Sequence, residues 1–458
     1  MISLPLTYHP DSAALFQAIA HEPWAVFLDS GHPHADAGVD ILAARPWRTL
    51  VTRGSITEIT DAHGARQIEG DPLELLRRYL PTAPQPAPSG FIGGAIGYFA
   101  YDLDLNARRG GRRDGLLPEM AVGLYDWAVL VDHGRRETRL LIGAAVPDTA
   151  AQAQALAGLF ERADGSMGQR AVFRVTEPPQ GDFTPASYYQ AFARIQDYIR
   201  AGDCYQVNLA QHYSAPAAGD PWSAYLGMRR LNPAPYAAYL NYPFGQVLSY
   251  SPESFLRVRG RSVETRPIKG TRPRDPDPAR DAELARELQY SAKDRAENLM
   301  IVDLLRNDLG KVCAPGSVAV PELFKLESYA KVHHLVSRVT GRLAPGHHAI
   351  DLLRAAFPGG SITGAPKLRA MDIIAELEPT ARSVYCGAIG WLSSNGDMDL
   401  NIAIRTAAIA QSRLHYWAGG GIVADSRAEE EYRECLDKAA AFLQFAAAHQ
   451  SAVPDGGG

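Results

Sequence analysis

Apolar and polar positions follow two different spacings along this chain. In the first third, short apolar stretches bounded by turn-forming residues predict strands at 24–30, 47–53, 55–60, 91–102 and 120–133. Helical spacing predicts helices at 150–163, at 188–203, within 281–309, at 366–378 and at 427–447. Because strands and helices are mixed rather than strictly alternating, we expect an α/β fold of the α+β type, with antiparallel or mixed sheets and helices packed outside.

Two regions and a tail are expected. A polar stretch at 175–186 marks the boundary between an N-terminal region, 1–180, and a C-terminal region, 185–447. The proline-rich segment 81–90 is predicted to be a surface loop, and residues 448–458 are predicted to be a disordered tail.

Composition excludes several classes of protein. Of the 458 residues, 46% are hydrophobic and 21% charged, which is ordinary for globular proteins. The net charge of −5 leaves no basic excess to neutralise phosphates, so a nucleic-acid partner is not expected. No apolar run reaches the roughly 18 residues of a membrane span and the N-terminus lacks a signal-peptide pattern, so we expect no membrane partner and a cytoplasmic location. The four cysteines lie far apart, which argues against a zinc site or a disulfide framework.

Acidic side chains on two predicted helices are candidate metal ligands. On a helical wheel Glu297 shares its face with Met300, Ile301, Leu304 and Leu305. A carboxylate there fits a buried salt bridge, and it equally fits a metal ligand or catalytic acid, because an unpaired buried charge is costly.

The last helix carries the second acidic group. Ser426 and Glu429 are spaced as a capping box at its start. Glu431, Glu434 and Lys438 then share one face, which fits either an exposed ion pair one turn apart or metal ligands. Two such helices suggest a hard cation such as Mg²⁺, which prefers oxygen ligands.

Glycine-rich segments and one arginine predict sites for anions. The segment 359–364, GGSITG, precedes a helix, where free backbone N–H groups favour a carboxylate or phosphate, although the Gly-Lys-Ser/Thr of a P-loop is missing. The glycines at 419–421 fit a hairpin turn or a second anion site, and Arg405 stands in an apolar strand pattern, where a guanidinium needs an anionic partner. Together these motifs predict a binding site for a small dicarboxylate beside a divalent metal.

Lys269 stands in the segment ETRPIKGTRPR, 264–274, among Arg266, Arg272 and Arg274. Burial and neighbouring positive charge would both disfavour its protonated form, and a neutral lysine amine is a nucleophile. A solvated surface lysine fits the same segment, because most lysines are exposed.

As a set, the motifs resemble those of the chorismate-utilising enzymes. SPESF, PIKGT, AENLMIVDLLRNDLG, FPGGSITGAPK, NIAIRT, GGGIVADS and EEEYRECLDKA stand in the order of that family, over about 185–445. FLDSG and GAIGYFAYD resemble the accessory half of the family's large subunits. The resemblance implies two packed, mostly antiparallel sheets with helices outside, and chorismate bound with Mg²⁺ in a cleft of the C-terminal part.

The resemblance also implies roles for single residues. Glu297 and Glu434 would coordinate Mg²⁺, with Asp294 and Glu431 as water-mediated or outer partners. Glu253 would be the general acid that protonates the hydroxyl departing from ring carbon 4. The residues implied in substrate binding are Gln206, Thr271, His334, Thr363, Gly364, Tyr385, Arg405, Gly419, Gly420, Gly421 and Lys438.

Lys269 distinguishes two branches of the family. The form PIKGT resembles the branch that makes 4-amino-4-deoxychorismate, on the route to para-aminobenzoate and folate, whereas the branch that makes anthranilate typically has alanine there. The implied reaction is a transaminase-type transfer, in which the lysine attacks ring carbon 2, the hydroxyl leaves carbon 4, and ammonia then replaces the lysine. Anthranilate formation remains the alternative.

The resemblance implies two partners besides chorismate. None of the four cysteines has the surroundings of a glutaminase nucleophile, so ammonia is expected from a separate glutaminase subunit. FLDSG and NPAPYAAYL resemble the elements of a tryptophan pocket, which would involve Ser30, Pro235 and Tyr236. A silent tryptophan-binding subunit is therefore a further alternative, against which the intact acid, lysine and metal residues argue.

Overall fold

Antiparallel strands from both halves of the chain build this protein. The computed structural model describes residues 1–31, 38–83, 88–103, 115–143, 145–146, 149–162, 171–329 and 332–450. Part of the predicted proline-rich loop and residues 451–458 of the predicted tail lie outside these ranges. Within them, no helix is long and apolar enough to cross a membrane.

The described strands form two sheets. The first has the order β1 (Ile2–Leu6), β10 (Glu137–Ile142), β9 (Trp127–Asp132), β3 (Val39–Ala43), β2 (Ala25–Asp29), β14 (Tyr236–Tyr242), β15 (Gly245–Ser251), β24 (Thr406–Ala410), β25 (Arg413–Val423), β13 (Gln206–Ala218) and β11 (Arg174–Val175), with β12 (Gln180–Gly181) and β21 (Gly364–Ala365) also paired to β13. The second has the order β18 (Ile268–Pro273), β20 (Val332–Arg342), β17 (Ser262–Thr265), β16 (Ser254–Arg259), β23 (Met398–Ile402), β22 (Ala388–Ser393), β7 (Gly94–Phe99), β8 (Met120–Tyr125), β4 (Arg48–Arg53), β5 (Ile56–Asp61) and β6 (Gly64–Glu69), with β19 (Ala319–Ser328) also paired to β20.

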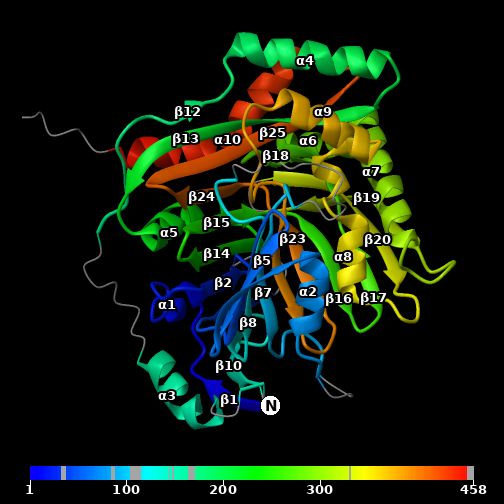
Figure 1. The fold of residues 1–458 in the computed structure, drawn as a ribbon. Coiled ribbons are helices and arrows are strands. Elements are labelled where there is room, and N and C mark those ends of the chain that lie inside the picture. The colour runs from blue at the N-terminus through cyan, green and yellow to red at the C-terminus, as the bar shows by residue number, and fades with distance from the viewer. Residues whose placement is uncertain are drawn as a thin grey trace, which may run out of the picture.

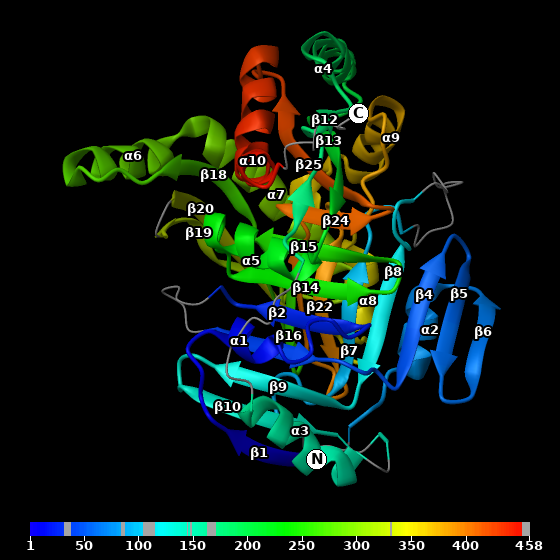
Figure 2. The same ribbon diagram turned by 90° about the vertical axis from the view of Figure 1, so that its left-hand side faces the viewer.

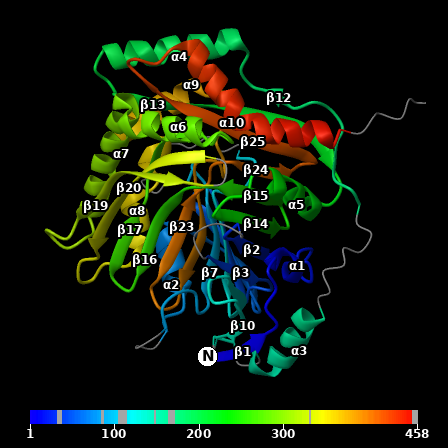
Figure 3. The same cartoon turned by 180° about the vertical axis from the view of Figure 1, so that it is seen from behind.

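Helices cover the outside of the two sheets, as the sequence predicts. They are α1 (Ser12–Phe16), α2 (Pro72–Tyr79), α3 (Thr149–Glu161), α4 (Pro185–Arg200), α5 (Pro221–Leu231), α6 (Pro278–Tyr290), α7 (Ala292–Gly310), α8 (Ala349–Ala356), the single 3₁₀ turn η1 (Gly360–Ile362), α9 (Lys367–Leu377) and α10 (Ala428–Ala448). In Figure 1, α4, α9 and α10 gather at the top and the N-terminal strands lie at the bottom. Figure 3 shows α7 beside β19 and β20.

Alternation along the strands produces a core on each face of the first sheet. In β2, Val26 belongs to the apolar cluster between the sheets, whereas Phe27 belongs to a second cluster under α1, α5 and α10. Trp222 of α5 and Phe442 of α10 are buried in that second cluster. The predicted fold class, two packed antiparallel sheets with helices outside, is confirmed.

The two predicted regions share both sheets. In the first sheet, β2 pairs with β14, and in the second, β7 pairs with β22, so N-terminal and C-terminal strands are neighbours. Figure 2 shows β4, β5 and β6, with α2 behind them, standing to one side of the shared body. Strands of the two regions are hydrogen-bonded to each other in both sheets, so the sheets themselves do not mark a boundary. The boundary between the regions stays a sequence prediction.

A buried ion pair connects the first sheet to the turn η1. Arg382 Nη2 lies 2.6 Å from Glu378 Oε1, and the two side chains are 1% and 5% exposed. The same guanidinium donates to the carbonyl oxygens of Ile362 and Asn208, both at 2.8 Å. Glu378 also accepts from the N–H of Ala210 at 2.8 Å. The pair therefore fixes η1 against β13.

Replacing Arg382 by Met should lower the free energy of unfolding by about 3–5 kcal/mol, because the substitution removes the guanidinium that neutralises a buried carboxylate. The matched control is Arg200→Ala, which breaks an exposed pair with Asp197 and should cost less than about 1 kcal/mol. Urea unfolding measures both. Equal losses of unfolding free energy in the two variants would show that the buried pair of Arg382 and Glu378 stabilises the fold no more than an exposed pair does.

Candidate active site

Lys269 and Glu253 meet at one residue of η1. Lys269 lies on β18, and Glu253 lies in the turn that enters β16. The Ser361 hydroxyl donates to Glu253 Oε1 at 2.7 Å, and Lys269 Nζ donates to the Ser361 carbonyl oxygen at 3.2 Å. Ser361 was not among the predicted functional residues, although it lies within the segment GGSITG.

Burial shifts both groups towards their neutral forms. Glu253 is 5% exposed, and burial raises its pKa from 4.5 to about 7, against the opposing effects of the Ser361 hydrogen bond and Lys269. Burial also lowers the pKa of Lys269, with a further contribution from Lys438, while Glu297 and Glu253 oppose the shift. Burial therefore favours the carboxylic acid form of Glu253 and the neutral amine form of Lys269.

The arginines around Lys269 do not cause this shift, contrary to the sequence-based expectation. Arg266 pairs with Glu327 at 2.5 Å, and Arg272 pairs with Asp294 at 3.2 Å. Arg274 pairs with Asp281 at 2.8 Å. Each guanidinium is neutralised by a carboxylate, so burial is the main cause of the lowered pKa of Lys269, and the charge that adds to it comes from Lys438.

Glu297 points from α7 toward the lysine. Its wheel neighbours Ile301 and Leu305 are buried, as predicted. Among the described residues, Glu297 has no ion pair within 4.0 Å, which disfavours the buried salt bridge considered above. Burial raises the pKa of Glu297, and Lys269 opposes this shift.

The acidic face of α10 lies opposite. Lys438 Nζ lies 2.6 Å from Glu434 Oε1 and donates to the Gly419 carbonyl oxygen at 2.9 Å, so the ion pair predicted one turn apart is present. The predicted capping box is wrong. The helix starts at Ala428 after Arg427, and the Ser426 hydroxyl donates to Glu431 Oε1 at 2.6 Å.

The space between these helices has the donors for a divalent cation. Glu431 Oε2 is buried and has no hydrogen-bond partner among the described residues. A Cβ added to Gly420 would lie 3.2 Å from that oxygen and 3.5 Å from Glu434 Oε1, so glycine keeps the space open. No three His, Cys, Asp or Glu side chains in the described ranges already form a metal-binding group. Mg²⁺ commonly uses only one or two carboxylates together with substrate and water, so the residues fit it.

Arg405 lies against α10 and close to His334. The prediction that Arg405 lies in a strand is wrong. Arg405 lies between β23 and β24 and has a left-handed φ of 53°. It donates to the Lys438 carbonyl oxygen at 3.3 Å. Burial, with the nearby Arg405, lowers the pKa of His334 to about 4, and the Thr271 hydroxyl contacts His334 Nδ1 at 2.9 Å. A neutral imidazole thus lies beside a guanidinium.

The other predicted substrate residues are buried around this centre. The Thr363 hydroxyl donates to the Gly359 carbonyl oxygen at 3.0 Å, and Gly364 packs against the backbone of Gln206. The Gln206 side chain is 1% exposed, and its Oε1 has no partner among the described residues. Tyr385 is 3% exposed, with its ring stacked on Trp417. Of these residues, only Gln206 presents an unpaired polar atom.

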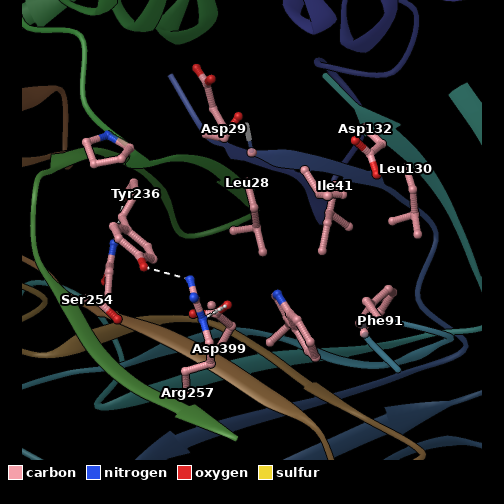
Figure 4. A pocket seen from close by; sticks show the side chains of 18 of the residues that line it. Leu28, Asp29, Ile41, Phe91, Leu130, Asp132, Tyr236, Ser254, Arg257 and Asp399 are labelled. Atoms are coloured by element: carbon pink, nitrogen blue, oxygen red, sulfur yellow. Dashed lines mark hydrogen bonds and ion pairs between the residues drawn. The ribbon is translucent and has the colours of Figure 1, made fainter. Parts of the chain in front are cut away.

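Ser30, Pro235 and Tyr236 line a separate cavity between the sheets (Figure 4). Its volume is about 810 Å³. The Tyr236 hydroxyl accepts from Arg257 Nη2 at 2.9 Å, and Arg257 Nε donates to Asp399 Oδ2 at 3.0 Å. The three residues predicted to bind tryptophan therefore lie together, and the neighbouring segment 32–37 lies outside the described residues.

The chain is similar to known proteins over most of its length. The model of a family described as chorismate binding enzymes matches residues 39–444. Aminodeoxychorismate synthase component 1 of Klebsiella aerogenes is 48% identical over 96% of this chain and 97% of its own length. Anthranilate synthase component 1 of Thermus thermophilus is 42% identical over 92% of each chain.

A solved structure has the same fold. Anthranilate synthase component I from Streptococcus pneumoniae matches with a TM-score of 0.78 and 33% identity, over 89% of this chain and 92% of that one.

The raised pKa of Glu253 should make stability depend on pH. Because the folded pKa of about 7 exceeds the ordinary 4.5, the contribution is fully present below about pH 4.5 and is lost as pH rises through 7. Its full size is about 3 kcal/mol. Glu253→Gln should remove this dependence when urea unfolding is followed from pH 5 to 8. Parallel curves for the two proteins would show that Glu253 titrates normally.

Proposed function

The chain belongs to the chorismate binding enzymes, and we propose that it is component 1 of an aminodeoxychorismate synthase, which converts chorismate and ammonia to 4-amino-4-deoxychorismate. The observation that carries the proposal is the contact of Lys269 and Glu253 with one residue, Ser361, beside two carboxylate helices. The identity to relatives of that name, over nearly the whole chain, supports it.

Lys269 is proposed as the nucleophile. Its neutral amine forms a bond to ring carbon 2, the ring double bonds shift, and the bond from carbon 4 to its hydroxyl breaks. Ammonia then adds at carbon 4, the bond from the lysine to carbon 2 breaks, and the electrons return through the ring. The lowered pKa of Lys269 supports this role, because only the unprotonated amine can attack.

Glu253 is proposed as the general acid. A carboxyl group with a pKa of about 7 retains its proton at neutral pH and can give it to the departing hydroxyl, which leaves as water. Burial thus moves both Glu253 and Lys269 towards the forms in which they would react.

Charged groups around the pair would hold the two carboxylates of chorismate. Arg405, for which the described residues supply no carboxylate partner, would bind the pyruvyl carboxylate together with Tyr385 and the backbone of Gly419–Gly421. Lys438, Thr363 and Gly364 would lie near the ring carboxylate, with His334 and Thr271 close to the ring. Gln206 carries no charge and cannot activate water as a base.

Mg²⁺ is proposed as the cofactor. Glu297 and Glu434 would bind it directly, and Asp294 and Glu431 through water, as the open space beside Gly420 and the unpaired oxygen of Glu431 support. When bound, the ion would neutralise the ring carboxylate and favour addition to the conjugated ring.

Ammonia is proposed to come from a separate glutaminase subunit. All four cysteines are buried, and burial raises the pKa of each thiol, to about 12 for Cys386 and Cys435. A glutaminase nucleophile needs the opposite shift. The relatives' designation as component 1 agrees with a second component. The cytoplasmic location and the binding of tryptophan in the cavity of Figure 4 stay predictions.

Product analysis tests the proposal. Purified protein with chorismate, Mg²⁺ and an ammonium salt should give an amine-substituted product that retains its pyruvyl group, identified by mass. Lys269→Ala should lower the rate at least about a hundredfold, because the covalent route is removed. Lys325→Ala, at an exposed lysine of β19, is the control and should keep the wild-type rate. Anthranilate as the wild-type product would establish the alternative function, which the similarity to anthranilate synthases favours.

Calorimetric titration with Mg²⁺ and chorismate tests the metal residues. Glu434→Gln should weaken binding of Mg²⁺ by at least about tenfold, because a neutral amide replaces a charged ligand. Glu429→Gln changes an exposed residue in the first turn of the same helix and should leave the affinity unchanged. Unchanged affinity in both variants would place the ion elsewhere.

A further inference from the structure

The residues on both sides of Ser361 are held by contacts within the protein. A Cβ on Gly360 would lie 2.4 Å from Leu304 Cδ2, so the turn packs directly on α7. On the other side, the Ile362 carbonyl oxygen accepts from Arg382 Nη1 at 2.8 Å and from Asn208 Nδ2 at 3.0 Å. The residue between these contacts has little freedom to move, which is the condition for a preorganised catalytic contact.

Ser361 touches the two proposed reactive groups with different atoms. Its side-chain hydroxyl donates to Glu253 Oε1 at 2.7 Å, and its main-chain carbonyl oxygen accepts from Lys269 Nζ at 3.2 Å. Substitution of the side chain therefore removes the contact with the acid and preserves the contact with the nucleophile.

We propose that Ser361 is a positioning residue for the general acid, whose hydroxyl orients the Glu253 carboxyl group and stabilises the carboxylate that remains after the proton has gone to the leaving hydroxyl. The proposal rests on the function proposed above. The hydrogen bond joins two neutral groups before transfer and has an ionised acceptor afterwards, so it becomes stronger as the reaction proceeds. An interaction that strengthens in the transition state raises kcat rather than affinity for substrate.

The groups around Glu253 determine how strongly the Ser361 hydroxyl influences ionisation of the carboxyl group. Lys269 of β18 and Lys438 of α10 are the cations that favour its charged form, and the Cys386 thiol before β22 is the neighbouring titratable group. Burial opposes ionisation, and the Ser361 hydroxyl is the largest of the opposing influences. Without it, Glu253 keeps its proton to higher pH.

Rates of chorismate consumption from pH 5.5 to 9 test the proposal with the full chain, Mg²⁺ and an ammonium salt. Ser361→Ala should lower kcat roughly ten- to a hundredfold, because it removes a hydrogen bond to a charged group, and KM should change less than about twofold. The limb that reports loss of the Glu253 proton should move to higher pH, while the limb that reports Lys269 stays in place. Ser361→Thr, which restores a hydroxyl, should recover most of the rate.

Two further variants separate positioning from folding. Ser393→Ala removes another buried serine hydroxyl, which donates to the Gly93 carbonyl oxygen at 3.3 Å at the far end of β22, and should leave kcat and both limbs unchanged. In a Glu253→Gln background, Ser361→Ala should cause no further loss, because the group through which it acts is gone.

The proposal is overturned if both limbs of the Ser361→Ala profile stay in place, or if Ser361→Ala lowers the rate equally with and without Glu253. These outcomes are read from chorismate consumption and do not depend on which amine product forms. Anthranilate as the product with a shifted limb would reject the proposed function alone, whereas the amino-deoxy product with an unmoved limb would reject the role of Ser361 alone.

Discussion

The buried ion pair of Arg382 and Glu378 is the constraint on which the geometry of the proposed site depends. Two hydrogen bonds join the pair, and three more reach residues far away in sequence: the carbonyl oxygens of Ile362 and Asn208 and the N–H of Ala210. Because such a guanidinium cannot leave its partner without exposing charge to an apolar core, the turn beside Ile362 cannot drift from β13. The position of Ser361, and through it those of Glu253 and Lys269, follows from a contact that touches no substrate.

Burial of the site then shifts Glu253 and Lys269 towards their neutral forms. Glu253 and Lys269 are opposite in charge when ionised, and their attraction alone would keep both charged. Burial acts against both charges and dominates for each, with Lys438 adding to the effect on the lysine. Neutral acid and neutral amine are the forms that the proposed displacement at a ring carbon needs. The same arginines that make the segment look strongly basic contribute little, because carboxylates on neighbouring elements neutralise them.

The sequence predicts those features that follow from periodic patterns or from local motifs. It predicts few of the features that depend on contacts between residues far apart in the chain. Strand alternation and helical spacing gave the fold class and placed Glu297 on its apolar face, because these patterns report burial directly. Motif order gave the family. The left-handed backbone of Arg405 and the hydrogen bond of Ser426 to Glu431 were missed, since neither strand pattern nor cap spacing shows where a tertiary contact overrides local preference. Arg382 and Glu378 carry no local signal at all.

The glycine run of β25 shows the same limit most clearly. It is no hairpin turn, since these residues pair along their length with β13. A side chain on Gly419 would meet the Leu209 carbonyl oxygen at 2.4 Å, and one on Gly421 would meet Gln206 Nε2 at 2.1 Å. Between them, Gly420 faces the carboxylates of α10. Three adjacent glycines thus serve close strand packing, open space beside two carboxylates, and room for a buried amide. A run of one residue type therefore has three separate physical causes, which only the neighbours across the sheet and on the helix can distinguish.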